Sequence, residues 1–220
     1  YTVPGEPLAL LVRELEVQNV RGKTLEIELA DGLPLVNPYG MNEFFIKNMS
    51  RTIEAWMTAD NVARKAPYLR LRVDATDRPE VTPIDEGNFF FGFDGTTGRL
   101  LDPVVDPAVL FGSVLDFSVP ERFADGSYER AMSSQVTQNK TPCAFVTAKF
   151  KIASDQTRRF VTILGHARSV DELNAYVKKA VLPGYLEDRR EENRRTVESV
   201  KSRIFTVTSD HVYDIYCGQT

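Results

Sequence analysis

Apolar and polar residues alternate with a period of two along several stretches of the chain. This alternation is typical of antiparallel strands that place one face in a core and the other in water. Residues 15–17 and 25–29 alternate in this way on either side of a turn at 19–23, which predicts a hairpin. The same alternation recurs at 69–73 and 144–152. More continuous apolar runs, at 89–93, 114–119 and 160–164, predict strands covered on both faces. We therefore expect six or seven strands before residue 165.

Two segments between these strands have other patterns. Residues 41–57 fit both a helical and an alternating spacing, and we interpret them as a short helix to about Met49 followed by a strand. Residues 94–107 are rich in Gly, Pro and Asp, so we expect a long surface loop there.

The character of the chain changes at Ser169. Ser169-Val170-Asp171-Glu172 is a capping box, in which the Ser hydroxyl accepts from the Glu172 amide and the Glu carboxylate accepts from the Ser169 amide. It predicts a helix that ends at Pro183-Gly184. A second helix is expected from about 185 to 203, with a narrow apolar stripe of Val197, Val200 and Ile204. Two helices after a block of strands indicate a connector rather than a βαβ repeat.

Composition excludes several classes of protein. Of the 220 residues, 42% are apolar and 26% charged, which is enough to build a sizeable core. The 27 basic and 31 acidic residues give a net charge of −4, so we expect no nucleic-acid partner. No apolar run approaches the roughly 20 residues that cross a bilayer, so we expect no membrane partner. The two cysteines are too sparse for a disulfide framework or a zinc pair, and such usage suits the reducing cytoplasm.

Motifs for catalysis or cofactor binding are absent from the sequence. The chain has two histidines, His166 and His211, for which we favour structural roles. Nucleophile-elbow, glycine-rich nucleotide and transition-metal patterns are missing, so we assign no catalytic residue, no metal and no cofactor. An oxygen-ligated calcium at Asp94-Gly95 or at 102–106 stays open.

Aromatic residues offer one lead to a ligand, because aromatic planes suit the apolar faces of sugar rings. Core packing is the alternative interpretation for most of them. The candidates are Tyr39, Phe44, Phe45, Trp56, Tyr68 and Phe89-Phe90-Phe91. Only Asn37-Pro38-Tyr39-Gly40, a polar loop with one aromatic ring, has the composition of a binding-site rim.

Several runs of sequence resemble the β-sandwich domain of the cellobiose-phosphorylase family, glycoside hydrolase family 94. They look most like the branch that acts on β-1,2-linked glucans. These runs are Asp31-Gly32-Leu33-Pro34, Asn37-Pro38-Tyr39-Gly40, residues 47–57, Arg78-Pro79-Glu80 and Glu86-Gly87-Asn88-Phe89. The opening residues 4–9 and the closing residues 212–220 are also similar, the latter to the first helix of the family's catalytic barrel.

The resemblance implies a mainly β chain: an antiparallel super-sandwich like that of galactose mutarotase at 1–165, then a two-helix linker at 166–204. Residues 205–220 would begin an (α/α)6 barrel that lies outside this sequence. In this family phosphate attacks the anomeric carbon with inversion while a carboxylic acid of the barrel protonates the glycosidic oxygen. The acid and the phosphate-binding residues would both lie beyond Thr220. Phosphate is a substrate of this reaction rather than a cofactor.

The expected function is therefore that of a noncatalytic domain that supports its own barrel and a subunit interface, as in a homodimer. Asn37, Tyr39 and Asn42 are the candidates for contact with a β-glucan oligosaccharide, because they offer amide and phenol groups beside one ring. A free-standing carbohydrate-binding module is the alternative from another class, and a complete small enzyme is a third.

Overall fold

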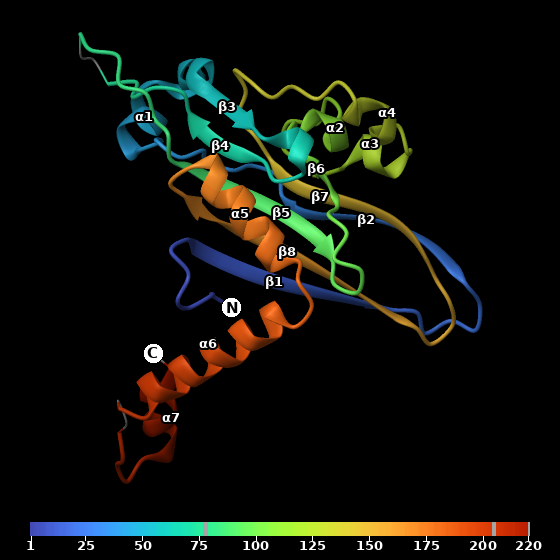
Figure 1. The fold of residues 1–220 in the computed structure, drawn as a ribbon, viewed down its shortest axis with the longest axis vertical. Coiled ribbons are helices and arrows are strands. Elements are labelled where there is room, and N and C mark those ends of the chain that lie inside the picture. The colour runs from blue at the N-terminus through green and yellow to red at the C-terminus, as the bar shows by residue number, and fades with distance from the viewer. Residues whose placement is uncertain (77–78, 204–205, 220) are drawn as a thin grey trace.

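The computed structural model describes residues 1–76, 79–203 and 206–219, and its strands form two antiparallel sheets (Figure 1). The strand order is β1-β8-β5-β4-β3 in the five-stranded sheet and β2-β7-β6 in the three-stranded sheet. The strands are β1 (Ala9–Gln18), β2 (Leu25–Leu33), β3 (Met57–Asp60), β4 (Tyr68–Leu71), β5 (Gly87–Asp94), β6 (Asp102–Val104), β7 (Ala144–Ile152) and β8 (Thr157–Ala167). Arg78, Ile204 and Thr220, which the sequence patterns include, lie outside the described residues.

Helices lie between the strands along the chain, and three more of the described helices follow the last strand. The α-helices are α1 (Glu43–Asn48), α2 (Ala108–Phe111), α3 (Glu121–Ala124), α4 (Tyr128–Met132), α5 (Val170–Ala180), α6 (Tyr185–Lys201) and α7 (His211–Gln219), and the 3-10 helices are η1 (Ser50–Trp56) and η2 (Val62–Arg64). Strands and helices occupy about equal shares of the described chain. The expectation of a mainly β chain is therefore confirmed only in part, through its two antiparallel sheets.

The predicted hairpin between 15–17 and 25–29 is wrong. Both segments are strands, but β1 pairs along its whole length with β8, and β2 pairs with β7 in the other sheet. The turn between them leads from one sheet to the other. Its buried Asn19 donates from Nδ2 to the carbonyl oxygens of Lys23 (2.9 Å) and Ile152 (3.0 Å), which holds the β1–β2 corner against the β7–β8 corner. Alternation identifies a strand but not its partner.

Strand β5 is buried on both faces, as its continuous apolar run predicts. Phe89, Phe91 and Phe93 belong to the core under α5, where the Phe91 ring meets Tyr176 at a centroid distance of 6.3 Å. Phe90 belongs to a second core cluster, which joins residues of both sheets. The five-stranded sheet thus lies between α5 on one side and the three-stranded sheet on the other (Figure 1).

Two segments differ from what the sequence predicts. Residues 114–119 are not a strand; they connect α2 to α3, and Phe117 packs its ring on Phe111 at 5.2 Å. With Phe145 of β7 this cluster covers the outer side of the three-stranded sheet. Residues 94–107 are not simply a surface loop, because β6 pairs with β7 there and Val104 is fully buried. Strand β6 forms because it pairs with β7, and the composition of residues 94–107 does not indicate this pairing.

The helical part of the chain follows its sequence signals closely. The Ser169 hydroxyl accepts from the Glu172 amide (3.2 Å) at the start of α5. The Glu172 carboxylate accepts from the Arg168 amide (2.8 Å) instead of that of Ser169.

The segment 41–57 contains the expected helix as α1, but η1 precedes the strand, which starts only at Met57. Among the described residues, no helix has both the length and the apolar character needed to span a membrane. Helices α6 and α7 extend away from the sheets (Figure 1).

Candidate functional site

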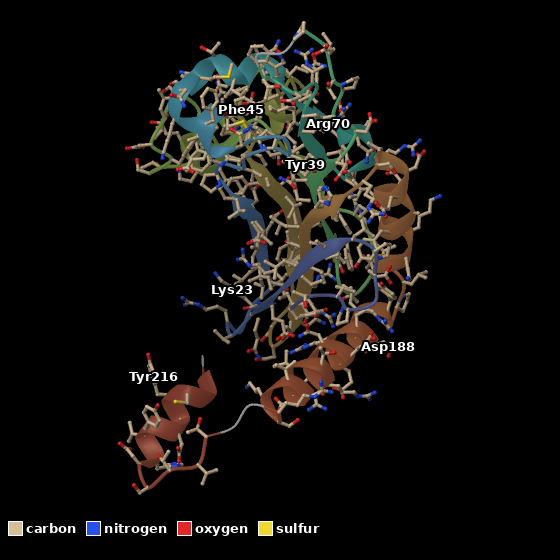
Figure 2. All side chains as sticks on the ribbon, turned by 90° about the vertical axis from the view of Figure 1, so that its left-hand side faces the viewer. Lys23, Tyr39, Phe45, Arg70, Asp188 and Tyr216 are labelled. Carbon is tan, nitrogen blue, oxygen red and sulfur yellow. The ribbon has the colours of Figure 1, made fainter. Side chains whose placement is uncertain are left out.

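Asn37, Tyr39 and Asn42, the three residues chosen from the sequence, line one open hollow of about 600 Å³. Its wall is formed by the loop before α1, by α1 itself and by the start of β5. The other lining residues are Pro38, Gly40, Met41, Glu43, Ile46 and Asn88. Figure 2 shows Tyr39 near Arg70 of β4. The structure therefore brings the three candidates together.

Tyr39 is held by its backbone at the end of the five-stranded sheet. Its amide donates to the Leu69 carbonyl (3.1 Å) and its carbonyl accepts from the Leu71 amide (2.7 Å), so it flanks Arg70 in a short parallel bridge. The interaction of its phenol with the Glu86 carboxylate, together with desolvation and the carboxylate charge, raises the pKa of Tyr39. The backbone hydrogen bonds thus fix the position of Tyr39, and its phenol faces Glu86.

His166 and Glu86 complete the environment of this ring. The His166 imidazole packs on the Tyr39 ring at a centroid distance of 4.8 Å and an angle of 36°, so it covers one ring face. His166 Nε2 lies 3.0 Å from Glu86 Oε2, and the histidine side chain is 30% exposed. One carboxylate therefore faces both the phenol and the imidazole. The structural role favoured for His166 is consistent with this packing.

The register of the sheet supplies the remaining polar group. Asn88 of β5 lies opposite His166 of β8, and its Nδ2 donates to the Asn37 carbonyl at 3.2 Å. Sequence reasoning missed Glu86 and Asn88 as parts of this site. They lie about 50 residues from the Asn37–Asn42 loop, and their run, Glu86-Gly87-Asn88-Phe89, entered the sequence analysis only as part of the family resemblance. Only the strand pairing brings them to Tyr39.

Asn42 has a structural task that the sequence interpretation did not include. Its Oδ1 accepts from the Phe45 amide at 2.9 Å, which makes it the N-cap of α1. Phe45 is buried, so the cap also fixes an anchor of the small core beside β3. Because the cap uses Oδ1 of Asn42, its NH₂ group is what Asn42 can offer a ligand. The Asn37 side chain is exposed.

The remaining aromatic candidates divide between core and surface. Phe45, Tyr68 and Phe89-Phe90-Phe91 are buried, as core packing requires, whereas Phe44 is 63% exposed on α1. Tyr68 donates from its hydroxyl to the Ala167 carbonyl at 2.7 Å, and burial raises the pKa of Tyr68 to about 12. None of the buried rings is available for stacking on a sugar.

The hollow offers hydrogen-bonding groups rather than reactive ones. The amides of three asparagines, Asn37, Asn42 and Asn88, and the Tyr39 phenol surround it, and the Glu86 carboxylate lies 3.0 Å from the His166 imidazole. Over the described ranges, no three His, Cys, Asp or Glu side chains form a group that could hold a metal ion. Asp94-Gly95 was one of the two positions left open for calcium. There, Asp94 Oδ1 accepts from the amides of Thr96 (2.9 Å) and Thr97 (3.0 Å), which is a local turn interaction.

Comparison with known proteins gives no assignment. No protein-family model matches the chain, and no curated protein matches it.

Proposed function

We propose that the chain is the noncatalytic β-sandwich domain and helical linker of an inverting glycoside phosphorylase of the cellobiose-phosphorylase family, acting on β-glucans in the cytoplasm. In this proposal the two sheets form the galactose-mutarotase-like super-sandwich at 1–165, followed by the linker at 166–204. The segment 205–220 begins the catalytic barrel. The resemblance runs support it, and so does the order of elements at the end of the chain, where the last strand, β8, is followed by α5, α6 and α7.

The observation that carries the proposal is the uncovered apolar surface of the last two helices. On α7, Val212 is 76% exposed and Tyr216 is 66% exposed, and Tyr213 and Ile215 are exposed as well. Figure 2 shows Tyr216 on α7, apart from both sheets. Contiguous apolar surface of this kind marks a site of contact with another protein body. A helical barrel that continues from α7 would bury it.

The hollow at Tyr39 has a defined role in this proposal. The Tyr39 phenol keeps its proton beside Glu86, and its oxygen can accept from a sugar hydroxyl, while the amide groups of Asn37 and Asn42 can donate. These groups would hold a β-glucan oligosaccharide at the edge of the cleft of the barrel. The reaction itself takes place in the barrel, where phosphate attacks the anomeric carbon and an acid protonates the departing oxygen.

Formation of glucose 1-phosphate tests this proposal. The full-length gene product and the 220-residue chain are each incubated with phosphate and β-1,2-gluco-oligosaccharides, with β-1,4 oligomers as the comparison. We expect the product only from the full-length protein, because the acid and the phosphate-binding groups belong to the barrel. Turnover by the 220-residue chain would contradict the assignment, and so would a full-length protein without phosphorylase activity. Sedimentation of the full-length protein tests the proposed homodimer.

A carbohydrate-binding module is the second candidate, favoured by the openness of the hollow and by the exposed Phe44 beside it. Calorimetric titration of the 220-residue chain with β-1,2- and β-1,4-glucan oligomers separates the two. Binding by the chain alone that Tyr39→Ala abolishes would favour the module. Absence of binding, together with activity of the full-length protein, would favour the supporting domain.

A further inference from the structure

A second hollow, of about 350 Å³, lies at the edge of the three-stranded sheet, remote from Tyr39. Strand β6 pairs only with residues 145–147 of β7, so from Ala148 to Ile152 β7 has a strand neighbour on one side only. The hollow opens beside this unpaired stretch, between the β5–β6 connection and α4. Its volume falls within the range of small-molecule sites.

The inner wall of this hollow is apolar and partly aromatic. Phe150 of β7 and Phe160 of β8 both line it, with ring centroids 4.9 Å apart and an angle of 52° between the planes. Further apolar side chains of the wall are Leu100, Leu101, Met132 and Ala148. A flat apolar group could therefore contact aromatic carbon here.

The acidic residues of the rim already have partners. Asp94 accepts from the two amides of its own turn, as described above. Asp102 Oδ1 lies 2.6 Å from Lys65 Nζ. Lys149 Nζ lies between two carboxylates, 2.7 Å from Glu28 and 3.4 Å from Glu129. The negative charges around the hollow are therefore largely compensated.

The two arginines of the rim have no hydrogen-bonded carboxylate partner among the described residues, although Arg158 forms a long ion pair with Asp94. Arg158 Nε is buried and has no hydrogen-bond partner in the described part of the chain. Its Nη2 lies 3.9 Å from Asp94 Oδ2, beyond hydrogen-bond distance. Arg99 is exposed at the mouth and forms no ion pair with any described residue. The N–H donors of these two guanidinium groups therefore lack hydrogen-bonded acceptors within the described ranges, and an anion in the hollow would supply them.

From these observations we propose that the hollow binds a small organic anion, with its carboxylate or phosphate group on Arg158 and Arg99 and its flat apolar body against Phe150 and Phe160. The guanidinium group presents parallel N–H donors that match carboxylate and phosphate oxygens. This site is independent of the proposed function, because it shares no residue with the hollow at Tyr39.

Calorimetric titration of the whole 220-residue chain with benzoate and with phenyl phosphate tests the site. We expect saturable binding of at least one probe, weaker at higher salt, because exposed charges are screened. Inorganic phosphate alone should bind at least about tenfold more weakly, because it lacks the apolar body. Arg158→Gln should weaken binding of the probe about tenfold, and Arg99→Gln by about threefold.

Arg168→Gln is the matched control, since Arg168 is an exposed arginine just beyond the opposite end of β8. It should leave binding unchanged. The exposed Arg99 side chain bonds to no described residue, so Arg99→Gln should not disturb folding. Weaker binding by this variant would therefore report on the site itself. Absence of saturable binding by both probes would overturn the proposal. So would equal effects of Arg99→Gln and Arg168→Gln, or phosphate binding as tightly as the aromatic probes.

Discussion

Replacing Asp31 by Ala should destabilise the fold by about 2–3 kcal/mol, because Asp31 joins the two sheets. Asp31 lies on β2 and is 8% exposed. It accepts from the Thr162 hydroxyl at 3.0 Å and lies 2.8 Å from Arg13 Nη2. Thr162 and Arg13 are opposite each other on β8 and β1, in the other sheet. A single carboxylate therefore connects three strands across the layers.

The two interactions of Asp31 contribute unequally. Its hydrogen bond with the buried Thr162 is charge-assisted, and its loss leaves a buried hydroxyl unpaired, at a cost of about 1–3 kcal/mol. The Arg13 side chain is 54% exposed, so solvent screens its ion pair, which adds at most about 1 kcal/mol. Asp31→Asn keeps an acceptor for the hydroxyl and loses only the charge, so we expect a smaller loss of about 1 kcal/mol.

Urea unfolding followed by circular dichroism measures these losses. At an m-value of roughly 2–3 kcal/mol/M, Asp31→Ala lowers the midpoint by about 1 M. Glu26→Ala is the control, because Glu26 is an exposed carboxylate on the same strand, and its loss should change stability by less than about 0.5 kcal/mol. A double-mutant cycle with Thr162→Val should give a coupling energy of about 1 kcal/mol. Equal midpoints for Asp31→Ala and Glu26→Ala, or no coupling, would refute the reasoning.

Two further substitutions test the packing and the electrostatics of the fold. Gly32→Ala should lower the urea midpoint clearly, because a Cβ there would lie 1.9 Å from a carbonyl oxygen of β7, whereas Gly22→Ala, in open space, should not; equal midpoints would contradict this. The pKa of Glu6 is lowered, since hydrogen bonds from Lys179 and Tyr185 outweigh the burial that raises it. Its stabilisation is therefore present above the unfolded value of 4.5 and is lost as pH falls through the lower folded pKa. The gap in unfolding free energy between wild type and Glu6→Gln should narrow at acidic pH, and a gap constant with pH would contradict this.

The sequence predicted elements better than it predicted their partners. Alternation located β1, β2, β4 and β7, continuous apolar runs located β5 and β8, and the capping box at Ser169 placed the start of α5 correctly. The sequence pattern could not predict which strands pair, because an alternation with a period of two is the same whichever strand lies alongside. The three-residue β6 was missed for a related reason, since its pairing with β7 is a tertiary contact inside a stretch rich in turn-forming residues.

The candidate site shows the same division between local and distant information. Asn37, Tyr39 and Asn42 share one short loop, so nearness in sequence guaranteed nearness in space. Glu86 directly precedes β5 and His166 lies on β8, and only the β5–β8 register brings them to the Tyr39 ring. A reading of local motifs has no access to that register, which explains why half of the site was missing from the prediction.

The residues that carry the family resemblance do not all bear on function. Asp31 joins the sheets, Gly32 allows close approach of β7, and Gly40 adopts a φ of +93° with Ile84 Cδ1 2.8 Å from the position of an added Cβ. The fold alone requires these residue types, so substitutions there should lower stability before they affect any ligand. Asn37 has no such task for its side chain, which is exposed. Asn37→Ala should therefore leave the urea midpoint unchanged and, in the full-length protein, raise the KM for the glucan. An unchanged KM would remove Asn37 from the proposed sugar contact.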